Sequence, residues 1–421
     1  MKIVVIGSGV IGVATAYFLR RRGYEVTVID RENGPGRETS FANGALLTPS
    51  MASPWNAPGT WKVLLASLGR SNAAMQLRLR ALPALAGWGI TFLRNSRPKM
   101  FQHNALCNLR LALYSMERMR TLRRETRIDY GRAARGTLNI FRDEAMWSHA
   151  AKSAQQWLRE GLSICVLSRR ETIELESGLA PIAERLAGAI YNEGDETGDA
   201  YRFCVALTDY ARQEGVEFRF RTEVSTLKLC AGRVIAAVTE QGPVVADRYI
   251  VAAGSYSAPL LRRIGVHLPI RPVKGYSLTF DCQETPRPLS IPVVDAQLRA
   301  VVVPLESGIR VAGTAEFAGY NRTMKLDRVR ALGMVVKEVL PQAHLDAATA
   351  RSWCGLRPMS ADGVPLIGRM QVENLMVSTG HGHLGWTMAA GSAQLLTDLV
   401  SGDYSSIDPA PYDPKRFGRA E

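Results

Sequence analysis

The N-terminal stretch constrains this chain more than any other feature. Residues 1–30 read MKIVVIGSGVIGVATAYFLRRRGYEVTVID. Residues 3–6 predict a buried strand, and residues 10–22 predict a helix that follows a glycine-rich turn. The turn and the start of the helix hold Gly7, Gly9, Val10, Ile11 and Gly12. Glycines at this spacing allow a tight turn, close approach of a pyrophosphate and close packing of helix on strand. The phosphates then face the positive end of the helix, so the sequence predicts dinucleotide binding.

The acidic residue Asp30 sharpens this prediction. It ends a second predicted strand at residues 26–30, where a carboxylate can accept hydrogen bonds from a ribose hydroxyl. Such an acid disfavours a 2′-phosphate, although Arg31 beside it leaves NADP open. These residues alone do not distinguish FAD from NAD.

Two later glycine turns favour a flavin. VAAGSYS at residues 251–257 follows a predicted strand, and TGHGHLGWTMA at residues 379–389 opens a late helix. The N-terminus of such a helix can stabilise negative charge on a reduced flavin ring. An enzyme that binds only NAD does not need this third segment.

Composition and charge bound the class of protein. The chain has 421 residues, 46% of them hydrophobic, and a net charge of +13, as in a globular protein of two or three domains. We expect neither a membrane span nor a secretory signal, because no apolar run is long enough and the start lacks the required pattern. The six cysteines show no CxxC spacing, which favours reduced thiols in the cytoplasm and predicts no metal site. No nucleic-acid-binding motif accompanies the charge.

The charge is concentrated in one segment. Residues 39–116 contain no Asp or Glu but eight Lys or Arg, interleaved with Trp, Leu and Phe. Such a surface can lie on anionic lipid headgroups, and ordinary solvated helices are the alternative. We therefore expect a cytoplasmic protein with possible peripheral contact to the inner face of the cell membrane through residues 39–116.

Periodicity along the chain predicts an interrupted domain organisation. Helical spacing covers residues 61–126, whereas strand-like alternation recurs between residues 270 and 315. We expect a nucleotide-binding domain in three pieces with a second domain inserted between them. The expected boundaries are 1–50, 195–268 and 350–410 for the first domain, 51–194 and 269–349 for the second, and 411–421 for a C-terminal tail.

Eight segments together resemble a known family. They are VVIGSGVIGVATAYFLRRRGYEVTVIDR, TSFANGALLTPSMASPWNAPG, GTLNIFR, DETGD, GSYS, PVKGYSLT, GLRPMSADGVPLIGR and TGHGHLGWTMAAGSAQLLTDL. In order and spacing they resemble the FAD-dependent D-amino-acid oxidase superfamily, and within it the bacterial D-amino-acid dehydrogenase (small subunit) group. The resemblance implies an α/β fold with a Rossmann-type FAD-binding domain, an inserted α+β substrate domain and non-covalently bound FAD.

The resemblance also implies roles for individual residues. The TSFANG segment would wrap the flavin, Val224 would contact adenine through its backbone, and residues 274–276 would lie over the flavin. Besides the residues of the first turn, Asp30 and Arg31, the implied cofactor-binding residues are Thr39, Ser40, Asn43, Gly44, Val224, Ala253, Gly254, Gly355, Gly380, His381, Gly382, Gly385, Trp386 and Thr387.

The GLRP segment implies the substrate. In the related oxidases the arginine of this segment binds the substrate carboxylate. This makes Arg357 the candidate here. A guanidinium suits the role because it pairs bidentately with a carboxylate. Relatives also supply a tyrosine near the segment DAQLRAVVVP, where this chain has none. We expect Tyr276, or in the alternative another side chain, to replace it as a second catalytic contact. Cys354 raises covalent flavin attachment, but a small buried thiol is the commoner explanation.

The expected reaction is oxidation of a D-amino acid to an imino acid, which hydrolyses to a 2-oxo acid and ammonia. The resemblance to dehydrogenases implies a quinone-type electron acceptor. Two alternatives stay open: an enzyme for cyclic or secondary amines, such as D-proline, hydroxy-D-proline, sarcosine or glycine, and a flavoprotein subunit without catalysis.

Overall fold

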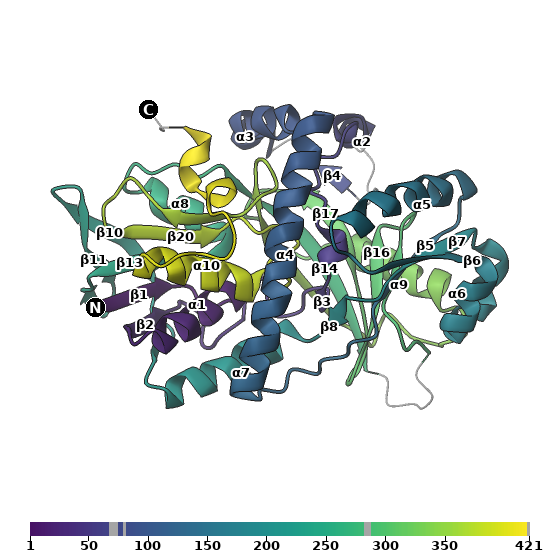
Figure 1. Cartoon of the computed structure of the whole chain (residues 1–421), viewed down its shortest axis with the longest axis horizontal. Helices are drawn as coiled ribbons and strands as arrows, with labels where there is room; N and C mark the ends of the chain where they lie inside the picture. The colour runs from purple at the N-terminus through teal and green to yellow at the C-terminus, as the bar shows by residue number, and fades with distance from the viewer. Residues whose placement is uncertain (67–74, 79–80, 282–287, 419–421) are drawn as a thin grey trace.

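The computed structural model describes residues 1–66, 75–78, 81–281 and 288–418. Two sheets dominate it, and the 29-residue helix α4 (Pro98–Thr126) crosses the junction between them (Figure 1). No helix in these four ranges is long and apolar enough to cross a bilayer.

The smaller sheet has six strands in the order β19-β20-β13-β1-β2-β9. All neighbours are parallel except β19, which is antiparallel to β20. Its strands are β1 (Lys2–Ile6), β2 (Glu25–Ile29), β9 (Glu217–Arg219), β13 (Arg248–Val251), β19 (Leu366–Arg369) and β20 (Leu375–Thr379). Buried β-branched residues on both faces of β1 explain its central place, because parallel strands are covered by other elements on both sides.

Helices cover one face of this sheet, and a small sheet with a short helix covers the other. On the first face lie α1 (Val10–Arg21), α7 (Ala200–Gln213) and α10 (Ala389–Ser401), with α4 packed on α10. On the second face lie α8 (Ser257–Arg262) and the strands β10 (Val224–Cys230), β11 (Arg233–Thr239) and β12 (Gly242–Val244). Gly391 of α10 allows the close approach of α4, since a Cβ there would lie 2.8 Å from Ser115 Cα.

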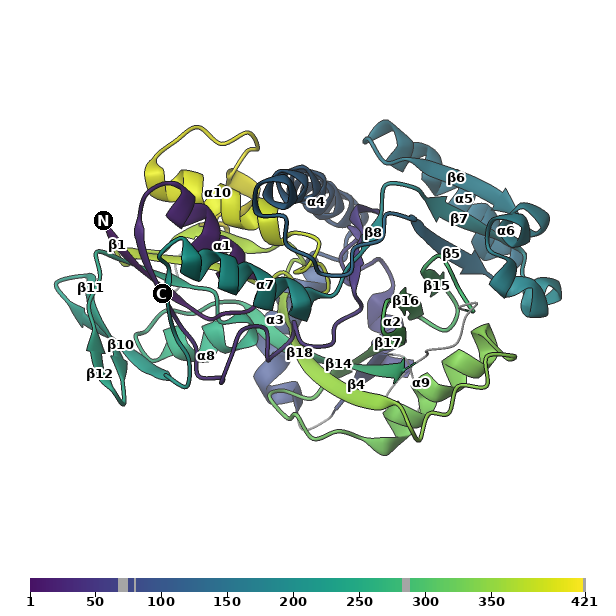
Figure 2. The same ribbon diagram turned by 90° about the horizontal axis from the view of Figure 1, so that it is seen from below.

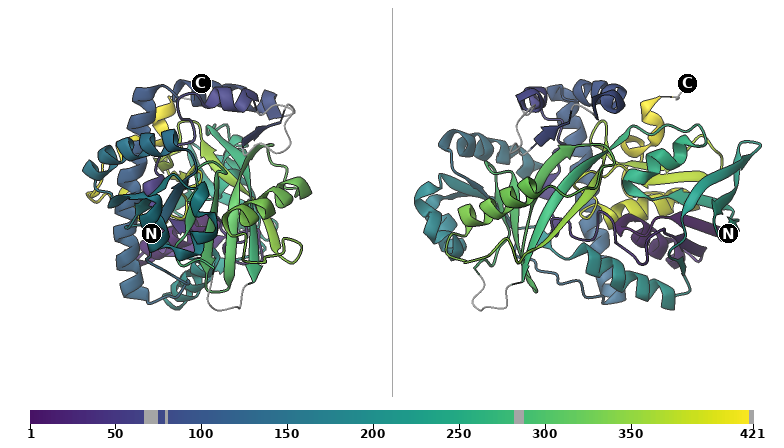
Figure 3. Two further views of the ribbon diagram at one scale, coloured as in Figure 1. Left: turned by 90° about the vertical axis from the view of Figure 1, so that its right-hand side faces the viewer. Right: turned by 180° about the vertical axis from the view of Figure 1, so that it is seen from behind.

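The larger sheet has nine strands, eight of them in the order β18-β14-β17-β16-β15-β5-β7-β6, with β4 paired to β17. They are β4 (Met75–Leu77), β5 (Thr137–Phe141), β6 (Ile164–Ser168), β7 (Gly188–Asn192), β14 (Ile270–Asp281), β15 (Val293–Asp295), β16 (Ala300–Leu305), β17 (Gly308–Phe317) and β18 (Arg351–Ser360). Helix α9 (Leu326–Val339) packs on the outer side of β14 and β17 (Figures 2 and 3). The remaining elements are β3 (Leu46–Leu47), β8 (Glu196–Thr197), α5 (Glu144–Arg159) and α6 (Arg169–Leu175).

The expected fold class is confirmed, and the smaller sheet is assembled from three distant stretches of chain. One expected boundary differs. Residues 351–360 belong to the larger sheet as its edge strand β18, although residues 350–410 were expected in the nucleotide-binding domain. The reason is that ten consecutive residues of β18 pair with β14, so this stretch completes the larger sheet before the chain returns to β19.

The expected helical run at residues 61–126 is also interrupted. It contains α2 (Thr60–Ala66), strand β4, α3 (Leu82–Arg94) and α4. Pro83 and Pro98 stand in the first turns of α3 and α4, because proline can begin a helix but cannot continue one. The basic residues Arg70 and Arg80 of this segment lie outside the described residues.

Candidate active site

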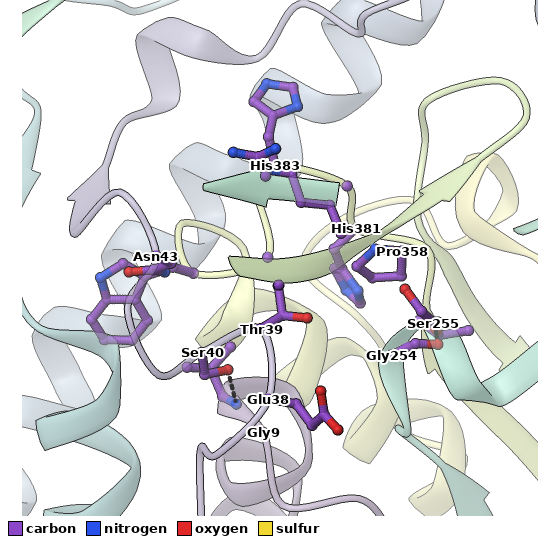
Figure 4. Close-up of a pocket in the computed structure, with 18 of the residues that line it drawn as sticks. Gly9, Glu38, Thr39, Ser40, Asn43, Gly254, Ser255, Pro358, His381 and His383 are labelled. Carbon is purple, nitrogen blue, oxygen red and sulfur yellow. Dashed lines mark hydrogen bonds between the residues drawn. The ribbon is translucent and has the colours of Figure 1, made fainter. Parts of the chain in front are cut away.

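A cavity of about 930 Å³ is lined by residues from both sheets. This volume is at the upper end of the ~300–1,000 Å³ typical of ligand pockets. Part of the wall is shown in Figure 4. The expected residues that line it are Gly7, Gly9, Val10, Ile11, Asp30, Arg31, Thr39, Ser40, Asn43, Gly44, Val224, Ala253, Gly254, Tyr276, Gly355, Arg357, His381, Gly382, Gly385 and Trp386.

The turn between β1 and α1 forms one end of the cavity. Gly7 has φ +109°, and a Cβ there would lie 2.6 Å from the carbonyl oxygen of Ala252. A Cβ on Gly12 would lie 1.8 Å from the carbonyl oxygen of Gly7. The first turn of α1 carries no acidic residue, so its positive end is open to an anion. The turn therefore fits a pyrophosphate.

Asp30 lies beside this turn at the end of β2. Its Oδ2 accepts hydrogen bonds from the backbone N–H (2.6 Å) and the hydroxyl (2.7 Å) of Ser8. Arg31 forms an ion pair with Glu38 and stacks over the ring of Tyr256, with 3.8 Å from Cζ to the ring centroid. Because the Arg31 guanidinium already has a carboxylate partner, this arrangement disfavours a 2′-phosphate and hence NADP.

The loop at residues 39–44 connects the turn to the larger sheet. Ser40 Oγ accepts from the backbone N–H of Val10 at 3.2 Å, next to Gly9 at the start of α1 (Figure 4). Thr39 Oγ1 donates to the carbonyl of Leu356 in β18 at 2.8 Å. From β14, Ser277 donates to the carbonyl of Ala42 at 2.7 Å. These contacts fix the loop as a wall that runs between the two sheets.

The glycine-rich turn before α10 forms another wall. Gly382 has φ +58°, and its N–H donates to the carbonyl of Pro358 at 2.8 Å. His381 Nε2 lies 2.9 Å from Ser392 Oγ, and burial lowers the pKa of His381 to about 3. Trp386 Nε1 donates to the carbonyl of Gly198 at 3.0 Å. His381 is therefore a neutral imidazole that braces the wall.

Three expected cofactor residues support the wall from behind. Gly12 packs against Gly7 as described above. A Cβ on Gly380 would lie 2.8 Å from Leu366 Cδ1, and Thr387 Oγ1 accepts from the N–H of Thr48 at 3.0 Å. These residues hold the backbone in place and do not offer a side chain to a ligand.

Arg357 of β18 occupies the wall formed by the larger sheet. Its Nη1 donates to the carbonyl of Thr314 at 2.9 Å, and its Cζ lies 5.3 Å from the centroid of the Trp55 ring. Gly275 of β14 makes room for it, since a Cβ there would lie 2.1 Å from Nη1. The accessible part of the Arg357 guanidinium faces the cavity. Burial lowers the pKa of Arg357 to about 10.

No carboxylate in the described part of the chain forms an ion pair with Arg357. A buried guanidinium without a counter-charge is costly unless a ligand supplies one. The planar group that suits it best is a carboxylate, because two parallel N–H donors can then be used. The cavity therefore joins a pyrophosphate-binding end to a carboxylate-binding end.

A bulge in β17 creates the carbonyl contact of Arg357. The register of β14 against β17 shifts between Lys274 and Tyr276, and Thr314 in β17 has φ +62°. A left-handed conformation of a β-branched residue costs on the order of 1 kcal/mol or more. The bulge releases the Thr314 carbonyl from the strand ladder and leaves it to accept from Arg357.

Tyr276 is among the residues that line the cavity, but its hydroxyl is turned away from Arg357. Successive side chains of a strand point to opposite faces, and Tyr276 pairs across the ladder with Cys354, whereas Gly275 pairs with Gly355. The Tyr276 hydroxyl donates to Glu316 Oε2 at 2.8 Å, in the layer beneath α9. Cys354 lies on the same outer face, with its Sγ 3.2 Å from the carbonyl of Arg322, so its thiol points away from Arg357.

The site also contains Trp55, which was not singled out as a site residue from the sequence, and His383, for which the sequence left a catalytic base, a cofactor contact and a loop residue open. Trp55 stacks on the imidazole of His383 at 5.1 Å between centroids and an interplanar angle of 21°. His383 Nε2 lies 3.1 Å from the carbonyl of Met51. Both residues stand in motifs already noted, SPWNAPG and TGHGHLGW, but only the fold brings these motifs together.

Comparison with known proteins agrees with this geometry. The family model described as FAD dependent oxidoreductase matches residues 2–399. The D-amino acid dehydrogenase of Sinorhizobium medicae (strain WSM419) is 40% identical over 418 residues, covering 99% of this chain and 100% of the relative. That of Vibrio atlanticus (strain LGP32) is 38% identical over 407 residues, 97% of both chains. The solved L-proline dehydrogenase of P. horikoshii shares the fold with a TM-score of 0.77, at 18% identity over 100% of this chain and 98% of that one.

The expected family and the expected cofactor are thus confirmed, and the structural likeness supports the fold. The chain belongs to the FAD-dependent oxidoreductase family, in the group of the D-amino acid dehydrogenases, and FAD is its cofactor.

Proposed function

We propose that this enzyme oxidises D-amino acids to imino acids, which water hydrolyses to 2-oxo acids and ammonia. The observation that carries the proposal is Arg357, a cation in the cavity wall whose described surroundings hold no carboxylate partner. The names of the full-length relatives support a D-amino acid as the substrate.

Different residues of the cavity would bind the cofactor and the substrate. The turn from Gly7 to Gly12 and the start of α1 would hold the pyrophosphate of FAD, and Asp30 would hold the ribose. When bound, FAD supplies the two-electron oxidation at the substrate Cα. Arg357 would bind the substrate carboxylate and fix the orientation of the Cα–H bond. The apolar side chains around it exclude water from this step.

Anaerobic reduction of the bound flavin tests this function. We expect D-amino acids to bleach the flavin absorbance and their L-enantiomers to leave it unchanged. The panel includes D-proline, hydroxy-D-proline, sarcosine and glycine as secondary or achiral amines. Bleaching by these amines alone would favour the enzyme of cyclic and secondary amines, and no bleaching by any amino acid would favour a flavoprotein without catalysis.

We further propose a quinone-type electron acceptor and peripheral contact with the membrane. Helix α3 presents the exposed apolar residues Ile90 and Leu93 on the side opposite its buried Trp88. The exposed basic residues near them are Lys62, Arg94, Arg97 and Lys99. An apolar face among basic side chains suits an anionic lipid surface. Helices α2 and α3 lie at one end of α4 (Figure 1), and Thr60 and Met75 of the same segment line the cavity.

Two measurements test the acceptor and the surface. Turnover with a soluble quinone should exceed turnover with oxygen alone, and rapid turnover with oxygen that quinone does not increase would contradict the acceptor. The protein should sediment with anionic vesicles more than with zwitterionic vesicles. Ile90→Glu together with Leu93→Glu should abolish this binding, whereas Ile235→Glu, on an exposed strand of the other half, should not.

A further inference from the structure

His383 is a cavity residue whose chemistry the preceding proposal does not use and whose orientation is fixed on two sides. Its Nε2 lies 3.1 Å from the carbonyl oxygen of Met51. A carbonyl oxygen only accepts hydrogen bonds, so Nε2 must carry the hydrogen. In the neutral imidazole this tautomer leaves a lone pair on Nδ1, which is then a hydrogen-bond acceptor.

The surroundings of His383 keep the ring neutral. Burial is the largest influence and lowers the pKa of His383; the hydrogen bond to the Met51 carbonyl raises it in part, and the positive charge of Arg357 lowers it again, so that it falls to about 4. The groups that face the ring are the Arg357 guanidinium, the Trp55 indole and the Met51 carbonyl. At neutral pH the ring therefore offers an acceptor and carries no positive charge of its own.

Trp55 positions His383 and Arg357 around one point of the cavity. Its indole lies 5.1 Å from the imidazole centroid and 5.3 Å from Arg357 Cζ. In Figure 4, His383 stands at the end of the cavity opposite Gly9, away from the turn that fits the pyrophosphate. A hydrogen-bond donor for a carboxylate and an acceptor for an N–H group thus both lie next to Trp55 in the cavity wall. An α-amino acid carries the two complementary groups on one carbon.

We propose that Nδ1 of His383 accepts a hydrogen bond from the substrate amino group while Arg357 binds the carboxylate. The inference rests on the proposed function and makes His383 a substrate-binding residue. No covalent bond changes at the imidazole in this role. Two contacts on one carbon fix the direction of the Cα–H bond, and they distinguish an amino acid from a carboxylic acid of the same size.

The test compares one amino acid with its deaminated counterpart. D-Alanine is the amino acid, and propionate is the carboxylate that keeps the contact to Arg357 but lacks the amino group. Binding of propionate is measured by perturbation of the flavin absorbance, and binding of D-alanine by the concentration dependence of anaerobic flavin reduction. If another D-amino acid reduces the wild-type flavin faster, the pair becomes that amino acid and the acid without its amino group.

Two variants distinguish the effect of the Nδ1 acceptor from the effect of the stacked ring. His383→Phe keeps the stacking on Trp55 and removes the acceptor, whereas His383→Asn places an oxygen near the position of Nδ1. We expect His383→Phe to weaken D-alanine binding about tenfold or more, the effect of losing a hydrogen bond to a charged group, and to change propionate binding less than twofold. His383→Asn should recover at least about a third of the affinity for D-alanine that His383→Phe loses.

The outcomes are distinguishable. If His383→Phe weakens the binding of both ligands equally, the role of His383 is structural and the inference is wrong. The inference is also wrong if His383→Phe affects neither ligand, or if His383→Asn recovers no affinity. If His383→Phe fails to retain FAD, His383→Leu replaces it in the same comparison. A wild-type flavin that no amino acid reduces would overturn the proposed function instead.

Discussion

The two faces of the larger sheet around β14 hold buried charges in opposite states: Arg357 stands in β18 and Glu316 in β17, and both strands pair with β14. On the cavity face, Arg357 has a carbonyl partner at 2.9 Å and no carboxylate among the described residues. On the outer face, the Glu316 carboxylate has a full set of ion-pair and hydrogen-bond partners. Its partners are Arg78 at 2.7 Å, Lys325 at 3.0 Å, Lys274 at 3.2 Å and the Tyr276 hydroxyl at 2.8 Å.

This difference separates structure from function within three neighbouring strands, β17, β14 and β18. A buried charge with a full set of partners stabilises a unique packing and leaves nothing for a ligand to bind. A buried charge that lacks its counterpart is retained only where a ligand completes it, so such groups mark functional sites. Glu316 is thus a structural residue, and we propose Arg357 as a binding residue.

The largest effect is expected from Arg357→Ala. Loss of the carboxylate contact should lower kcat/KM for D-amino acids about 10³-fold, or ~4 kcal/mol. The protein should stay yellow and its free energy of unfolding should not fall, because the variant removes an uncompensated charge. Steady-state kinetics and urea denaturation check both statements. Arg351→Ala, on the same strand in an exposed ion pair with Asp281, is the control and should change neither.

Glu316→Gln should lower the stability of the protein and leave substrate binding nearly unchanged, the opposite of Arg357→Ala. Three cations would lose their shared carboxylate, so the free energy of unfolding should fall by about 3–5 kcal/mol. The KM of the folded enzyme should change little, since Glu316 faces away from the cavity. Urea denaturation measures the first effect, with Glu174→Gln in an exposed helical ion pair as the control. A variant as stable as the wild type would contradict the structural role.

The stability difference between wild type and Glu316→Gln should depend on pH. The side-chain hydrogen bonds from Arg78, Lys325 and Tyr276 outweigh burial and lower the pKa of Glu316 from 4.5 to about 2. Its stabilising contribution is therefore complete above pH 4.5 and is lost as the pH falls towards 2. Denaturation midpoints of the two proteins should converge over this window, and a constant gap would contradict the assignment.

The smallest effect is expected from Tyr276→Phe. It removes one hydrogen bond to Glu316 and should lower the free energy of unfolding by about 1 kcal/mol. Substrate KM should stay within twofold of the wild type, because the hydroxyl points away from Arg357. A tenfold rise in KM without loss of stability would restore Tyr276 as a carboxylate contact.

Much of the nucleotide-binding end could be predicted from the sequence. Gly7, Gly9, Gly12 and Asp30 stand within 30 residues, and their roles follow from backbone geometry that a local pattern specifies. Arg357 was predicted through the resemblance of the GLRP segment. The face of Tyr276 could not be predicted in the same way, because the alternation of a strand tells which residues share a face but not which face meets the cavity.

Long-range contacts decided the rest. Trp55, Thr314 and His383 surround Arg357 although they stand 302, 43 and 26 residues from it in the sequence, and no local pattern links them. By itself, the sequence determined that this chain binds a dinucleotide, because strand, turn and helix are encoded by neighbouring residues. Only the tertiary structure decided which of the two buried charges, Arg357 or Glu316, is left for a ligand. The reason is that a buried group is satisfied or unsatisfied by partners that the fold brings from other strands and helices.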